Sequence, residues 1–217
     1  MLALGVFLVS VLALIGLLAP MLRSVSDIEK LDEITSVVNT VNAFLQSSPD
    51  IALRDTNGNV TQTRFDGIYQ AVSSNGSDEA TIFVFRYFDD TSSDSIRLEV
   101  GFSPDENDDG AFLGSDSIVD ETLFQDAAGP IYRVVLTVSP VTPLQPVPLR
   151  TDPRDADTGI YALTQDLVNY PEGSLAFEAR IFAEDPPGPG RTFETETDLS
   201  ALSIVEPDFT FSAAIVR

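Results

Sequence analysis

The chain begins with an uninterrupted apolar run, from Met1 to Leu22, in which no side chain carries a charge. A helix of this length spans about 33 Å, and the hydrocarbon core of a bilayer is about 30 Å thick. The alternative is a buried core helix, but such helices rarely exclude charge from every side over so many turns. The pattern therefore predicts a transmembrane helix over residues 1–22, in contact with membrane lipid.

A cleaved signal peptide fits this run less well than a retained anchor. No basic residue precedes Arg23, and Leu18-Ala19-Pro20 is a poor cleavage site. The positive-inside rule alone would place Arg23 in the cytoplasm, whereas the acidic, strand-rich remainder suits an external domain. A basic leader upstream would reconcile the two. We expect a single pass of the cytoplasmic membrane with the C-terminal domain outside.

After Pro20 the apolar residues recur at steps of three or four, and charged or polar residues fill the positions between them. This spacing predicts an amphipathic helix over residues 23–47 that covers a sheet. Ser47, Ser48 and Pro49 predict its end. The apolar positions are Leu22, Val25, Ile28, Leu31, Ile34, Val38, Val41 and Leu45.

From Pro49 onward the dominant period is two, which is typical of half-buried antiparallel strands. Arg97 with Glu99, and Glu178 with Arg180, would then lie on outward faces in contact with solvent. Turns are expected where Gly, Asn, Asp and Pro cluster, and residues 140–153 are expected to form a surface loop. The strand predictions cover residues 82–88, 98–102, 132–138, 175–182 and 209–215, with weaker ones at 51–54 and 67–72.

Together these patterns predict an α+β fold. A long N-terminal helix over residues 1–47, with a membrane half (1–22) and an amphipathic half (23–47), packs on one antiparallel sheet domain. Residues 48–217 form that acidic, β-rich, extracytoplasmic domain.

Composition excludes several functions. The net charge is −22 with only 12 basic residues, so nucleic acid is not expected as a partner. Cys and His are both absent, which removes disulfides, thiolate metal sites and an imidazole base. A carboxylate hydrolase needs paired carboxylates in a cleft, and nothing places Asp89 with Asp90, or Glu194 with Glu196, in one. We expect no enzyme activity, no catalytic residues, no organic cofactor and no small-molecule substrate.

One acidic segment has the spacing of a calcium loop. Asp105-Glu106-Asn107-Asp108-Asp109-Gly110 matches D-x-[DN]-x-[DN]-G, and Asp116 occupies the twelfth position. Oxygen ligands at alternate positions converge on one cation because the glycine turns the chain. The candidate ligands are therefore Asp105, Asn107, Asp109 and Asp116. Asp116 is shorter than the usual Glu and the flanks are not helical, so a solvated acidic turn is the alternative.

The N-terminal residues resemble those of type IV pilins and pseudopilins. The stretch Met1-Leu2-Ala3-Leu4-Gly5-Val6-Phe7 is similar to the start of the apolar helix in that family. Gly16-Leu17-Leu18-Ala19-Pro20 resembles the helix interior of the Verru_Chthon cassette protein B group. Phe209-Thr210-Phe211, with Ala213 to Arg217, is similar to that group's ending. The family's cleavage motif and its Glu are missing and would lie just upstream of Met1, so no processing residue is assigned.

The resemblance implies a structural subunit of a type IV pilus-like or type II secretion-like filament. Its partners would be identical or related pilin-like subunits, and it could leave the membrane for an extracellular filament. Filaments arise from head-to-tail contacts that do not close. The alternative is a membrane-anchored, calcium-binding adhesion or binding module, which would be a stable monomer with calcium-dependent melting.

Overall fold

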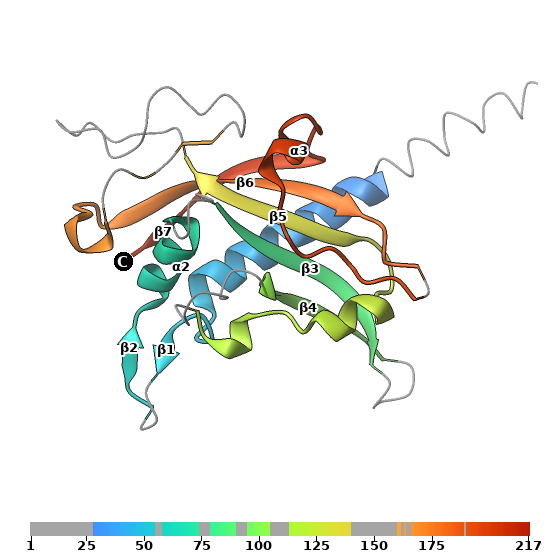
Figure 1. Ribbon diagram of the computed structural model, residues 1–217, viewed down its shortest axis with the longest axis horizontal. Coiled ribbons are helices and arrows are strands. Elements are labelled where there is room, and N and C mark those ends of the chain that lie inside the picture. The colour runs from blue at the N-terminus through green and yellow to red at the C-terminus, as the bar shows by residue number, and fades with distance from the viewer. Residues whose placement is uncertain are drawn as a thin grey trace, which may run out of the picture. The chain divides into compact units, whose positions relative to one another are not determined.

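The structure is a computed structural model in which the chain divides into two compact units, residues 1–39 and 40–217. The described residues are 28–54, 58–73, 79–89, 95–104, 113–139, 160–161, 163, 166–188 and 190–217 (Figure 1). In the first unit the described residues, 28–39, are helical, and the second unit contains a helix segment followed by a sheet. No helix within these described ranges is long and apolar enough to cross a membrane. The predicted transmembrane segment, residues 1–22, lies outside them.

The second unit contains a five-stranded antiparallel sheet. Its spatial order is β4-β3-β5-β6-β7, so β4 and β7 form the two edges. All five stronger strand predictions are confirmed, and the α+β class with them. The strands are β3 (Glu79–Asp89), β4 (Ser95–Phe102), β5 (Ile131–Val138), β6 (Ser174–Glu184) and β7 (Phe209–Val216).

A smaller two-stranded sheet pairs β1 (Leu53–Arg54) with β2 (Val60–Gln62). The weak prediction of a strand at 51–54 is therefore confirmed in part, and β2 was not predicted. Short helical elements complete the described chain: η2 (Ser115–Ser117), η3 (Glu121–Asp126), η4 (Leu167–Asn169) and α3 (Leu199–Ser203).

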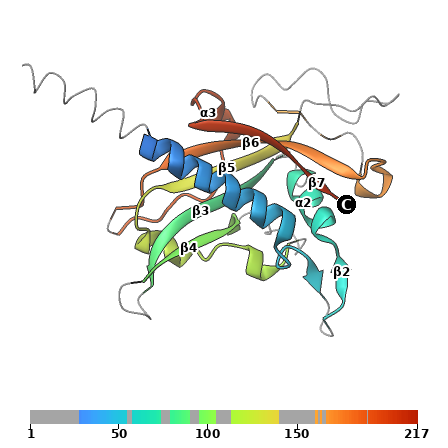
Figure 2. The ribbon, with the colours of Figure 1, turned by 180° about the vertical axis from the view of Figure 1, so that it is seen from behind.

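The predicted end of the N-terminal helix is confirmed, because residues 28–47 are helical and the helix stops before Ser48. Within the second unit, Val41, Phe44 and Leu45 are buried, as the three-to-four spacing predicts. The Phe44 ring lies 5.5 Å from the Phe102 ring on β4, centroid to centroid. Residues 40–47 therefore pack on one face of the sheet, which Figure 2 shows from that side.

The prediction of half-buried strands is wrong at the centre of the sheet, because every residue of β5 is buried. Ile82 faces the helix side, since it pairs with Phe102, and its neighbour Phe83 faces the other side. On that second face the Phe83 ring contacts Phe124 of η3 at 5.2 Å and Phe193 at 5.6 Å, centroid to centroid. Loop segments before β5 and after β6 thus cover a face that alternation alone assigns to solvent (Figure 1).

The weak strand prediction at 67–72 is also wrong, because this segment is the helix α2 (Arg64–Ser73). Thr63 caps its start: the Thr63 amide donates to the Asp66 carboxylate at 3.2 Å, and the Asp66 amide donates to the Thr63 hydroxyl at 3.3 Å. This reciprocal pair is a capping box, which favours a helix over a strand. The buried side chains follow a helical spacing and are Phe65, Ile68, Tyr69 and Val72.

Candidate functional site

Arg133 is a buried charged residue with several hydrogen-bond partners. It lies on β5 and is 4% exposed. Its Nε donates to Oε1 of Glu184 on β6 at 2.6 Å, and its Nη1 donates to the carbonyl of Thr195 at 3.0 Å and to the hydroxyl of Thr197 at 3.1 Å. Further donations reach the carbonyls of Glu194 and Glu196. A guanidinium is suited to this role because it offers five donors in a fixed plane.

The same guanidinium also stacks against two aromatic rings. Its carbon lies 4.9 Å from the centroid of Phe83 and 5.7 Å from that of Phe193. Nearby, the hydroxyls of Thr81 and Thr197 are 2.6 Å apart, and the Ser103 hydroxyl donates to the Thr195 carbonyl at 3.3 Å. Residues 193–197, which we call the strap, are therefore held across β3 and β5 by bonds to their backbone.

The strap was not predicted from the sequence. The backbone carbonyls of Glu194 and Glu196 accept the bonds from Arg133, while both residues are exposed. The interpretation of Glu194 and Glu196 as surface charge is consistent with that exposure. The one signal in the sequence is Arg133 itself, the single charged residue of its strand.

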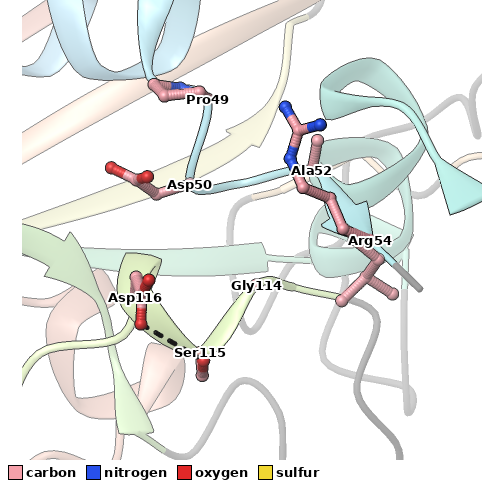
Figure 3. Close-up of a pocket in the computed structure, with 8 residues that line it drawn as sticks. Pro49, Asp50, Ala52, Arg54, Gly114, Ser115 and Asp116 are labelled. Atoms are coloured by element: carbon pink, nitrogen blue, oxygen red, sulfur yellow. Dashed lines mark hydrogen bonds between the residues drawn. The ribbon is translucent and has the colours of Figure 1, made fainter. Parts of the chain in front are cut away.

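A small open hollow of about 280 Å³ lies between the turn after the N-terminal helix and the segment before η2 (Figure 3). Asp50, Arg54, Ser115 and Asp116 supply its polar lining. The two segments touch at Gly114, where an added Cβ would come within 1.9 Å of the Asp50 carbonyl oxygen. Only glycine permits this approach, so a larger side chain would force the walls of the hollow apart.

Of the predicted calcium ligands, only Asp116 lies in the described part of the chain. It is exposed in η2 at the rim of this hollow, and its Oδ1 accepts a hydrogen bond from the Ser115 hydroxyl at 3.3 Å. Asp105, Asn107 and Asp109 lie outside the described residues. Among the residues that are described, no three His, Cys, Asp or Glu side chains form a metal-binding group. Calcium binding therefore stays a prediction.

Two carboxylates near β4 have perturbed acidities. Burial, and secondarily the negative charge of Asp120, raise the pKa of Glu99 above its usual value. The pKa of Asp120 is lowered because the Thr122 hydroxyl and amide both donate to it. The prediction that Glu99 lies on a solvated face is therefore wrong in part, because the chain around Asp120 passes close to it. The Glu178–Arg180 pair, at 2.9 Å, is likewise mostly buried.

The charged interactions described above hold separate segments of the chain together. Arg133 forms an ion pair with Glu184 and hydrogen bonds with the strap. The hollow at Gly114 is lined by exposed side chains of both charges. Comparisons of the chain with family profiles, with curated proteins and with solved structures find no significant match.

Proposed function

We propose that this protein is a structural subunit of a type IV pilus-like or type II secretion-like filament. The proposal joins two observations. The sequence opens with an apolar segment that resembles a pilin N-terminus, and the following helix packs through residues 40–47 on an antiparallel sheet. The single observation that carries it is this order along one chain: an apolar segment in the sequence, then an amphipathic helix, then a sheet.

The physical argument concerns the apolar segment. A run of 22 uncharged residues is stable in lipid, or against other apolar helices once it has left the lipid. A domain fixed to the end of such a helix is carried into any helical bundle that the segment enters. The net charge of −22 would keep the outside of the resulting polymer soluble.

Mass spectrometry of the native N-terminus, from envelope and sheared extracellular fractions, tests the proposal. We expect the same mature terminus in both fractions, starting a few residues upstream of Met1. The amine should be methylated, and a Glu should occupy the fifth position. A cytoplasmic marker measured in the same extracellular fraction controls for lysis.

A terminus at Met1 itself, recovered only from the membrane fraction, would contradict the filament proposal. The protein would then be an anchored binding module, and the calcium prediction would become the next property to measure.

A further inference from the structure

The strand β4 is an open edge of the sheet. It pairs with β3 from Ser95 to Phe102 without a bulge, and within the described residues no strand pairs with its other side. In the described part of the chain its end is occupied by Ile118, which bridges to Phe102, and by Val119, whose amide donates to the Phe102 carbonyl at 3.0 Å. Sheet edges of soluble proteins are usually shortened, bulged or protected by inward charges, because an open edge pairs with other chains. β4 is long and regular, and among the described residues its outer side is unpaired except at Phe102.

The exposed side chains beside this edge are apolar on one face of the sheet. Ile96 is 56% exposed and Leu98 is 53% exposed, and both lie on the same face because they are two residues apart. Phe88 of β3 pairs with Ile96 and is 54% exposed. Val100 continues the same row and is half-buried. These four residues form a continuous apolar row, which we call the β4 row.

The other face of β4 carries one charge of each sign, Arg97 and Glu99. When two copies of one strand pair antiparallel about a two-fold axis at residue k, residue k+n lies opposite residue k−n of the other copy. With the axis at Leu98, Arg97 lies opposite Glu99, and Ile96 lies opposite Val100. With the axis at Arg97 or Glu99, like charges would lie opposite each other, which is destabilising.

We propose that β4 is a self-complementary edge that pairs antiparallel with β4 of a second copy of this chain, centred on Leu98. The pairing joins two five-stranded sheets and forms two Arg97–Glu99 pairs across the axis. It also merges the β4 rows of the two copies. It ends near Val100, because Ile118 already bridges to Phe102.

Two further observations support a second copy as the occupant. Arg97 is exposed even though its guanidinium reaches the Asp89 carboxylate at 2.7 Å, so it remains accessible to a second carboxylate. Glu99 is half-buried, and burial first and the negative charge of nearby Asp120 second raise its pKa. An incoming arginine would relieve that repulsion. The other edge strand, β7, carries no charged residue that could define a register.

Disulfide trapping tests the pairing, because the full chain contains no cysteine. In the proposed dimer the cysteine of Leu98→Cys would lie directly opposite the same cysteine of the second copy. Their Cα separation would be within the range that a disulfide bridges. Mild oxidation of the full chain should therefore give a covalent dimer on a non-reducing gel. Ile96→Cys is the register control, since the two copies of this cysteine would lie about 14 Å apart along the strands. Thr210→Cys, exposed on β7, is the control for the other edge. Both controls should stay monomeric.

Charge exchange in the Leu98→Cys background supplies the second arm. Arg97→Glu or Glu99→Arg alone places like charges opposite each other and should lower the crosslinked fraction several-fold. The combined R97E/E99R variant restores opposite charges and should recover the dimer. Absence of a Leu98→Cys dimer from folded protein, or a combined variant no better than the single ones, would overturn the proposal. Either result leaves the filament proposal untouched, since that rests on the N-terminal helix.

Discussion

At the scale of single residues, Arg133 decides how the second face of the sheet is covered. Its guanidinium neutralises Glu184 and donates to several oxygens of the strap, a segment about 60 positions further along the chain. Without Arg133 these carbonyls would lose a charged hydrogen-bond donor, which costs free energy. The strap is therefore held by Arg133 together with its own Phe193 and Thr197 side chains.

Replacing Arg133 by Met should lower the free energy of unfolding by about 3 kcal/mol, because the Glu184 carboxylate, which is 31% exposed, and the strap carbonyls lose a charged hydrogen-bond donor. Arg180→Met is the matched control, since it removes one partner of the Glu178 pair without touching the strap. Urea unfolding of the full chain measures the free energy of unfolding of both variants. Trypsin cleavage after the exposed Arg191 should accelerate in the Arg133 variant only. Equal cleavage rates in the two variants would show that Arg133 does not hold the strap.

Glu99 should make stability depend on pH. Burial first, and the charge of Asp120 second, raise its pKa in the folded state, so the folded chain binds this proton more tightly than the unfolded chain does. Its stabilising contribution is present below the unfolded pKa of about 4.3 and is lost as the pH rises through the folded pKa. At pH 7 the ionised Glu99 therefore lowers the stability of the fold.

Glu99→Gln should raise the melting temperature at pH 7, and its advantage should disappear below pH 4. Melting curves across this range, at a protein concentration low enough to keep the chain monomeric, measure the difference. Glu121→Gln, at an exposed position on η3, controls for the loss of one negative charge. A Glu99→Gln advantage that is the same at pH 7 and below pH 4 would contradict the assignment.

At the scale of elements, period and capping explain which predictions succeeded. Alternating apolar residues identified β3 to β7, because antiparallel strands expose successive side chains on opposite faces. α2 was missed although the capping signal was present: Thr63 and Asp66 stand three residues apart, shortly before the apolar Ile68 and Tyr69. The segment was assigned a period of two, so the helical spacing of its apolar residues was not recognised.

The end of the N-terminal helix should matter more for stability than its exposed face. Leu45 is fully buried, so Leu45→Ala should lower the free energy of unfolding by about 2–5 kcal/mol. Gln46→Ala, at the next and exposed position, should change it by less than about 0.5 kcal/mol. Denaturant titration of both variants gives the comparison. Similar losses at the two positions would mean that residues 40–47 do not dock through this face.

At the scale of the whole molecule, the net charge of −22 acts against every association between copies. A homomeric contact therefore needs local features that outweigh this repulsion. Salt at physiological strength screens charges beyond about 8 Å, so short contacts of complementary charge and apolar area decide the outcome. The contacts proposed above, one through the N-terminal apolar segment and one through β4, would each be of this kind.

The sequence by itself determined the helix end at residue 47, the five main strands and the exclusion of His and Cys chemistry. These properties are local. The period of a strand or helix is visible in its own residues, and the absence of a residue type holds for the whole chain. Only the tertiary structure decided that the second face of the sheet is covered, that Arg133 is buried beneath the strap, and that Gly114 must be glycine. Those properties depend on contacts between segments far apart in the sequence, and no local pattern predicts which segments will be in contact.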